Sequence, residues 1–200
     1  MNNKPAALIT GVSRNKGIGA AIARALAAGG WNICITYWQP YDESMPWGST
    51  PGEVETIVAD LKEAGANTVA IEADLSKPEN PSFIMEKAES ALGSITALIL
   101  SHCYSVDSDI QTTTIESFDY HFAVNARASW LLIEEYCSRF RGPFGAGRIV
   151  SITSDHVAGN LPYGASKGAM DRIVLAAAEE NRDKGITANV INPGATDTGW

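Results

Sequence analysis

Residues 6–19 read AALITGVSRNKGIG, and this stretch decides the fold. Residues 6–10 are short and largely apolar, which is typical of a buried strand. A glycine-bearing loop follows, and a helix is predicted from Ile18 to Ala28, stopped by Gly29 and Gly30. Glycines let such a loop approach a pyrophosphate, and the helix N-terminus offers it free amides and partial positive charge. The spacing is not GxGxxG, so the stretch predicts nucleotide binding while leaving an ordinary strand-to-helix turn as the alternative.

The rest of the chain continues the alternation of apolar strand and amphipathic helix. Further strands are predicted at residues 31–38, 68–72, 97–100, 148–152 and 186–191. Helices are predicted at residues 50–64, 80–92, 113–141 and 163–184, with Thr50 and Thr113 as N-caps of capping boxes. Residues 39–49, rich in Pro, Trp and Gly, are expected to form a long loop. This alternation predicts one doubly wound α/β domain over residues 1–200, a three-layer Rossmann fold whose parallel sheet is covered on both faces.

Composition and charge narrow the classes of partner. The chain is 45% hydrophobic and 19% charged, with a net charge of -8 and no basic run longer than two residues. Nucleic acid and anionic membrane surfaces are therefore poor candidates. The apolar run at the start is too short for a signal peptide or a membrane span. Cys34, Cys103 and Cys137 have no paired spacing and indicate reduced thiols in a cytoplasmic protein, and no metal site is expected.

A tyrosine and a lysine four residues apart supply the first candidate for chemistry. On a helix, Tyr163 and Lys167 would lie one turn apart on the same face. A free tyrosine has a pKa near ~10, and a unit charge at ~4 Å in a medium of dielectric ~20 contributes about 4 kcal/mol. Lys167 would then lower the pKa of the Tyr163 phenol towards neutral pH, so that the phenol could exchange a proton with a substrate oxygen. The alternative is a helix that merely begins with Tyr and carries an exposed Lys.

Six motifs in order resemble the short-chain dehydrogenase/reductase family, and the chain is most similar to its 3-oxoacyl-(acyl-carrier-protein) reductases. The motifs are Thr10-Gly11 through Gly17-Ile18-Gly19, Asp74, Asn125, Ser154, Tyr163 with Lys167, and Pro193-Gly194. The resemblance implies an NAD(P)(H)-dependent oxidoreductase that transfers hydride between nicotinamide and a small-molecule carbonyl or alcohol, with 3-oxoacyl thioesters as one candidate. It also implies a homodimer or homotetramer. A catalytically silent nucleotide-binding sensor on the same fold is the alternative.

The same resemblance implies a role for each matching residue. Tyr163 would exchange the proton, Lys167 would lower its pKa and hold the nicotinamide ribose, Ser154 would orient the substrate oxygen and Asn125 would complete the proton path. Ser151 lies nearer the family's usual distance from Tyr163, but Ser154 follows the predicted strand's C-terminal end, where open α/β sheets place their ligands. The residues expected to contact the cofactor are Gly11, Ser13, Arg14, Lys16, Gly17, Ile18, Gly19, Tyr37, Trp38, Asp74, Leu75, Ser101, Pro193, Gly194, Thr196 and Thr198.

The sequence departs from the family at three places. The glycine loop is longer than usual, and residues 101–104, SHCY, stand where the family has Asn-Asn-Ala-Gly. The short segment between Ser154 and Tyr163 would reshape the substrate mouth. Because the sequence ends at Trp200, the family's C-terminal substrate loop and last strand are expected to be missing.

The cofactor preference depends on the end of the second strand. A carboxylate there would bind the ribose 2′-hydroxyl and repel a 2′-phosphate, but none occurs before Asp42. Arg14 and Lys16 would meet a phosphate from the loop, so NADP(H) is favoured over NAD(H). The alternative is that both cations are solvated. Tyr41, Met45, Pro46 and Trp47 could form either a rim of the cofactor site or an interface, and residues 130–133 could belong to the core or to a subunit contact.

Overall fold

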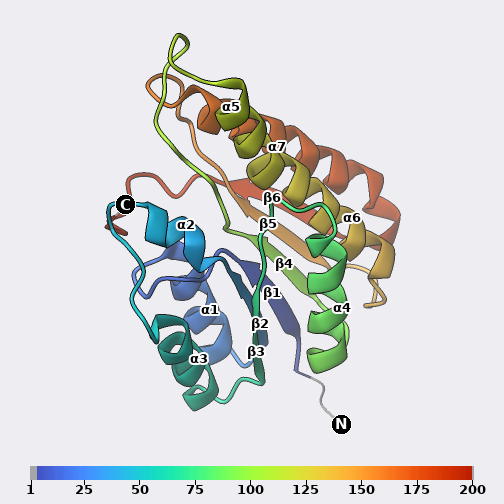
Figure 1. The fold of residues 1–200 in the computed structure, drawn as a ribbon. Coiled ribbons are helices and arrows are strands. Elements are labelled where there is room, and N and C mark those ends of the chain that lie inside the picture. Colours follow the sequence, from blue (N-terminus) through green and yellow to red (C-terminus); the bar gives the residue numbers. More distant parts are fainter. Residues whose placement is uncertain (1–3, 200) are drawn as a thin grey trace.

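Six parallel strands form the centre of the molecule (Figure 1). They are β1 (Ala6–Thr10), β2 (Asn32–Tyr37), β3 (Thr68–Glu72), β4 (Ala97–Leu100), β5 (Arg148–Ile152) and β6 (Thr187–Ile191). The computed structural model describes residues 4–199. The strand order is β3-β2-β1-β4-β5-β6, so the chain winds outward from β1 in both directions. The predicted doubly wound parallel sheet is confirmed.

Two helix layers pack on the faces of the sheet. Helices α1 (Ile18–Ala28) and α3 (Glu53–Glu63) cover one face, and α4 (Asn80–Leu92), α6 (Ala128–Arg139) and α7 (Leu161–Glu180) cover the other (Figure 1). Successive side chains of a strand point to opposite faces, and Leu8 and Ile9 of β1 accordingly belong to the two different cores. The predicted three-layer Rossmann fold is therefore confirmed. Among residues 4–199, no helix has both the length and the apolar character needed to cross a membrane.

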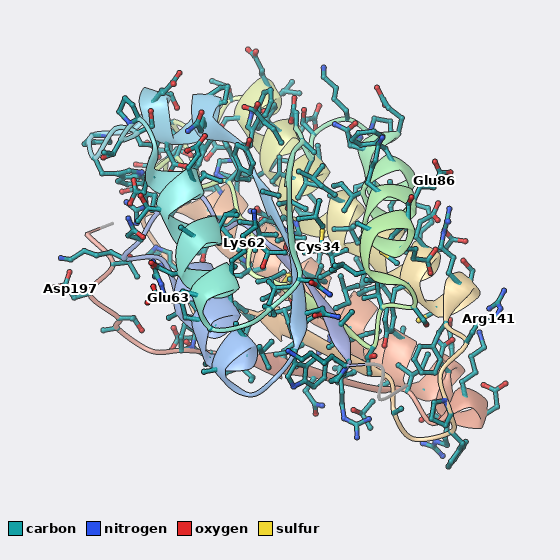
Figure 2. The ribbon with its side chains drawn as sticks, turned by 90° about the horizontal axis from the view of Figure 1, so that it is seen from below. Cys34, Lys62, Glu63, Glu86, Arg141 and Asp197 are labelled. Atoms are coloured by element: carbon teal, nitrogen blue, oxygen red, sulfur yellow. The ribbon has the colours of Figure 1, made fainter. Side chains whose placement is uncertain are left out.

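The burial of the strands falls from the centre of the sheet to its edge. Every residue of β1 is buried, as expected of a central parallel strand with apolar side chains on both faces. In Figure 2, Cys34 of β2 lies in the interior, whereas Glu86 and Arg141 lie at the periphery. At β6, by contrast, Thr187, Asn189 and Ile191 are exposed. The helix layers therefore cover the centre of the sheet more completely than this edge strand.

The connection after β2 differs most from the prediction. The expected loop contains a short helix, α2 (Gln39–Ser44), which accommodates Pro40 because the first turn of a helix needs no amide hydrogen from it. Helix α3 begins at Glu53 rather than at Pro51, because Gly52 has a φ of 80° and interrupts the helical backbone. Thr50 is consequently not the N-cap, and its carbonyl accepts a hydrogen bond from the Glu53 amide.

The long helix predicted from Thr113 is divided into three parts. It consists of α5 (Ile115–His121), a π-helical turn η1 (Phe122–Arg127) and α6. Its N-cap is Thr114, whose Oγ1 accepts from the amide of Ser117 at 3.1 Å, so the prediction of Thr113 is wrong by one residue. The helix that carries Tyr163 begins two residues earlier than predicted, and a short 3-10 turn, η2 (Arg182–Lys184), follows it.

Candidate active site

A cavity of about 570 Å³ runs along the carboxyl ends of the strands. Residues from the connections after all six strands line it. The strand order reverses beside β1, and open α/β sheets bind their ligands at this kind of switch point. The topology therefore brings segments far apart in the sequence to one crevice.

The glycine loop lies at the cavity and packs so closely on neighbouring backbone that two of its glycines leave no room for a side chain. Gly11 has a φ of 72°, and a Cβ added there would lie 2.6 Å from the Cα of His102. A Cβ on Gly19, at the start of α1, would lie 2.8 Å from the carbonyl oxygen of Gly11. The N-terminal end of α1 thus packs directly on the loop at the cavity wall. This arrangement fits a dinucleotide pyrophosphate, because helix N-termini offer free amides to phosphate groups.

All of the residues predicted to contact a cofactor line this cavity, with the exception of Lys16. The Lys16 ammonium lies 4.0 Å from a carboxylate oxygen of Asp197, and both side chains are exposed. The structure therefore does not bring Lys16 to the place where a phosphate contact was expected. Asp74 does line the cavity, and one of its carboxylate oxygens accepts a hydrogen bond from the Ser76 amide at 2.8 Å.

Tyr163 and Lys167 lie one turn apart on α7 and both line the cavity. The Lys167 Nζ lies 5.9 Å from the centre of the Tyr163 ring and donates a hydrogen bond to the carbonyl oxygen of Ile152 at 2.8 Å. Lys167 as a whole residue is only 2% exposed, so the alternative of an exposed lysine is wrong.

The pKa of each group follows mainly from burial. Burial lowers the pKa of Lys167, with Cys103 and Asp171 acting in the opposite direction. Burial also raises the pKa of the Tyr163 phenol, Cys103 adds to this, and a hydrogen bond with Ser154 partly offsets it. The phenol pKa is thus shifted upward, against the direction expected from Lys167. At neutral pH the phenol carries its proton.

The structure distinguishes between the two candidate serines. Ser154 lines the cavity and shares a hydrogen bond with Tyr163. Its Oγ also accepts from the amide of His156 at 3.2 Å. Ser151 is fully buried in the sheet, and its hydroxyl donates to the sulfur of Met170 at 2.9 Å. Of the two, only Ser154 is placed to meet a molecule bound beside Tyr163.

Asn125 lies behind the cavity wall, in the π-helical turn η1. Its Oδ1 accepts from the Tyr104 amide at 2.7 Å, and its Nδ2 donates to the Tyr104 carbonyl at 2.9 Å and to Ser166 Oγ at 2.9 Å. Ser166 in turn donates to the carbonyl oxygen of Tyr163 at 2.8 Å. Asn125 therefore joins the segment after β4 to the helix that carries Tyr163 and Lys167. Both backbone hydrogen bonds of the Asn125 side chain go to Tyr104.

His102 connects three elements around the site. Its Nε2 lies 3.0 Å from the carbonyl oxygen of Val124, which can only accept, so Nε2 carries the hydrogen. Its Nδ1 consequently accepts from the hydroxyl of Thr10, at 2.6 Å. Burial lowers the pKa of His102 to about 3, with a contribution from Lys167. The ring is therefore a neutral hydrogen-bonding bridge and not a proton carrier near pH 7.

Several cavity residues lie outside the set predicted to contact the cofactor. Tyr41 and Trp47, left open between a rim and an interface, both line the cavity. Tyr104, which stands where the family has a glycine, packs its ring against Tyr41 and Tyr120 with centroid distances of 5.4 and 4.5 Å. The rest of the lining outside that set includes Asp42, together with His102 and Cys103 of the 101–104 segment. For Asp42 the only signal was its position as the first carboxylate after the second strand.

A parallel sheet of this order with a glycine loop at its switch point binds dinucleotides, and a tyrosine beside a lysine on the same cavity adds a group for proton transfer. Fold and site together define a nucleotide-dependent oxidoreductase. The family model described as short chain dehydrogenase matches residues 5–200, and the chain belongs to this family.

Comparisons with individual proteins agree with this assignment. An uncharacterized oxidoreductase of Bacillus subtilis, YjdA, is 34% identical over 199 residues, which cover 97% of this chain and 76% of the relative. A short chain dehydrogenase from Burkholderia cenocepacia, solved in complex with NADP, has a TM-score of 0.84 at 30% identity, covering 98% of this chain and 76% of that one. A 3-oxoacyl-(acyl-carrier-protein) reductase from Brucella melitensis has a TM-score of 0.84 at 25% identity, covering 99% of this chain and 78% of that one. The resemblance drawn from the motifs is confirmed at the level of the family.

Proposed function

We propose that the protein is an NADP(H)-dependent carbonyl reductase of the short-chain type, acting on a small-molecule ketone or aldehyde. The observation that carries the proposal is the convergence of Tyr163, Ser154 and Lys167 on the cavity that the glycine loop borders. The hydrogen bond between Ser154 and Tyr163 also argues against the alternative of a silent nucleotide sensor, because a sensor has no need for this pairing.

Each side chain has a distinct part in the proposed reaction. A bound nicotinamide would supply the hydride that reduces the carbonyl carbon. Tyr163 donates its phenolic proton to the oxygen as negative charge develops there, and Ser154 donates a hydrogen bond to the same oxygen. The product is an alcohol, and the tyrosinate left behind is stabilised by the nearby Lys167 ammonium. Burial keeps the phenol protonated, which is the form that must donate the proton when a carbonyl is reduced.

Asn125 acts in this proposal as a positioning residue. It does not line the cavity, but its amide holds the backbone of Tyr104 and, through Ser166, the first turns of α7. We assign it the task of keeping the segment after β4 in register with Tyr163 and Lys167.

The preference for NADP(H) is supported by one residue of the cavity and by one relative. Arg14 places a guanidinium in the cavity wall, and the solved Burkholderia relative binds NADP. Likeness to the Brucella reductase makes 3-oxoacyl thioesters the first substrates to test.

A homodimer is the proposed assembly, formed through the layer of α6 and α7. Trp130 on α6 and Leu175 on α7 are 52% and 51% exposed, and the two helices pack side by side (Figure 1). Large apolar side chains exposed on neighbouring elements are typical of an interaction surface.

The function is tested by replacing Tyr163 with Phe. Purified protein is assayed by NADPH absorbance against a panel of ketones and 3-oxoacyl thioesters. We expect Tyr163→Phe to lower kcat at least about 100-fold, because the proton donor is lost, and to leave the Kd for NADPH within about twofold of wild type. Tyr120→Phe is the matched control, since it removes another cavity phenol, and it should keep its activity. Full activity of Tyr163→Phe would contradict the role of Tyr163, and wild-type protein that binds NADPH but reduces nothing in the panel would favour the sensor.

A further inference from the structure

An ion pair between α2 and the glycine loop lies within the wall of the cavity. Asp42 and Arg14 both line the cavity, and the Arg14 Nε lies 3.8 Å from the Asp42 Oδ1. The two side chains are only 6% and 16% exposed. A carboxylate so deeply buried at a nucleotide-binding edge needs an explanation, because burying a charge is costly unless it is paired.

The carboxylate of Asp42 is held in place by groups other than Arg14. The hydroxyl of Ser13 donates a hydrogen bond to one of its oxygens. The indole Nε1 of Trp47 donates to the other at 3.0 Å. Two neutral donors, one from the glycine loop and one from the segment after α2, therefore fix the carboxylate. It would stay in position if Arg14 moved.

The guanidinium of Arg14 is bound less tightly to Asp42 than to its other neighbours. A separation of 3.8 Å exceeds hydrogen-bonding distance, so the contact with Asp42 is electrostatic alone. Arg14 Nη2 donates to the carbonyl oxygen of Thr198 at 2.9 Å, and its Cζ lies 4.8 Å from the centre of the Trp47 ring. The pair thus combines a fixed anion with a cation that can turn to another anion without breaking a hydrogen bond to the carboxylate.

We propose that Asp42 determines how strongly the protein distinguishes the phosphorylated from the unphosphorylated nicotinamide nucleotide. Its carboxylate occupies Arg14 as an internal counter-ion, so a 2′-phosphate must compete with Asp42 for the guanidinium and meets its negative charge. A free ribose hydroxyl meets no such penalty, because a carboxylate accepts hydrogen bonds from hydroxyl groups. This inference rests on the proposed function, since it assumes that the cavity binds the cofactor.

The role explains why β2 ends without an acidic residue. The carboxylate expected at the end of this strand is supplied instead by α2, which turns the chain back over the glycine loop and brings Asp42 to Ser13. Asp42 limits the preference for NADP(H), and Arg14 creates it.

The experiment measures binding of 2′,5′-ADP and 5′-AMP by calorimetry, so that no turnover is needed. Asp42→Asn removes the negative charge. Its amide oxygen can still accept from the Trp47 indole, and its amide nitrogen can donate to the Ser13 hydroxyl. We expect its affinity for 2′,5′-ADP to rise about tenfold or more, while its affinity for 5′-AMP does not rise. Arg14→Gln should do the reverse and lower the affinity for 2′,5′-ADP at least about tenfold, with 5′-AMP binding within about threefold of wild type.

Glu43→Gln is the matched control for Asp42→Asn. Glu43 is the next residue of α2, is exposed and does not line the cavity, so the variant loses the same unit of charge outside the site. Thermal unfolding without nucleotide shows whether each variant is folded, and Asp42→Ser replaces Asp42→Asn if the latter is not.

Two results would overturn the inference, and they are distinguishable. If the ratio of the affinities for 2′,5′-ADP and 5′-AMP is the same in the uncharged Asp42 variant as in Glu43→Gln, the role of Asp42 is contradicted. The proposed function is not affected by that result. Failure of the wild-type protein to bind either nucleotide contradicts the proposed function, and the role of Asp42 with it.

Discussion

At the scale of single residues, the site is built on buried polar side chains that fix one another. His102 accepts from Thr10 of β1 and donates to the carbonyl of Val124 in η1, so it ties the central strand to the π-helical turn. Asn125, next to Val124, continues this network to Tyr104 and Ser166. Buried polar groups of this kind stabilise a structure only when every partner is in place. Substitutions among them should therefore be costly.

His102 should make stability depend on pH. Its folded pKa of about 3 lies below the ordinary histidine value of 6.5, so between these values the unfolded chain binds a proton that the folded protein does not. The free energy of unfolding should then fall by about 1.4 kcal/mol for each pH unit below 6.5 on account of this residue. Urea unfolding between pH 4.5 and 7 should show a shallower decline in His102→Asn than in wild type. Parallel curves for wild type and His102→Asn would contradict the assignment.

Gly11 should tolerate no side chain. In Gly11→Ala the new Cβ meets the backbone of His102 at 2.6 Å in addition to an unfavourable φ of 72°. We expect the free energy of unfolding to fall by about 3 kcal/mol and nucleotide binding to be lost. Gly30→Ala is the control, because Gly30 also has a positive φ, of 87°, but nothing lies within 4 Å of its added Cβ. It should lose only about 1 kcal/mol, and equal losses in the two variants would show that the contact with His102 is unimportant.

At the scale of elements, the interruption of the long helix by η1 is the feature that places the site. A π-helical turn inserts extra backbone into a helix and occurs frequently at functional sites. Here it carries Asn125, whose side chain reaches both the segment after β4 and α7. A regular helix from Ile115 to Arg139 would rotate one end relative to the other, so the turn sets the direction in which Asn125 points.

Asn125→Ala tests this connection. The amide of Tyr104 would lose its buried acceptor and Ser166 its donor, and each unsatisfied buried group costs about 1–3 kcal/mol. We expect a loss of about 3 kcal/mol in urea unfolding and, in the folded variant, a fall in kcat of more than about tenfold with KM within about threefold. Asn189→Ala, on the exposed face of β6, should change stability by less than about 0.5 kcal/mol. A variant with the wild-type kcat would leave Asn125 a purely structural role.

The elements themselves could be predicted to different extents. Strands such as Ala97–Leu100 are visible in the sequence, because runs of apolar and β-branched residues are rare outside a buried sheet. Helix α2 is not visible, since its six residues bury only Asp42 and so show no apolar periodicity. The π-helical turn is equally hidden, because its composition suits an α-helix.

The same limit applies to the site. Tyr163 and Lys167 could be paired from their spacing, as both lie on one helix. The position of Asp42 depends on where α2 directs the chain after β2, and the upward shift of the Tyr163 pKa depends on burial. Both are consequences of tertiary structure that spacing along the sequence does not contain.

At the scale of the whole molecule, the proposed dimer would bury the outer surface of only one of the two helix layers. Trp130 and Leu175 lie on the layer of α6 and α7, and Trp130→Glu should therefore convert a dimer into a monomer, because a buried unpaired charge opposes association. Light scattering measures the mass, and NADPH binding shows that the fold is kept. Phe83→Glu is the control, since Phe83 on α4 is 42% exposed beside the β3 edge, away from α7. A wild-type protein that is monomeric at micromolar concentration would contradict the proposed assembly.

The central position of β1 has a consequence for co-translational folding. β1 is synthesised well before one of its two partners, because β4 begins only at Ala97. Until that segment has emerged from the ribosome, one of the two hydrogen-bonding edges of β1 stays unpaired, and the sheet of the nascent chain is incomplete. Pairings so distant in sequence form slowly and leave strand edges accessible to other chains. Slower translation before residue 97 would prolong this exposed stage, and we expect the yield of folded protein to be sensitive to it.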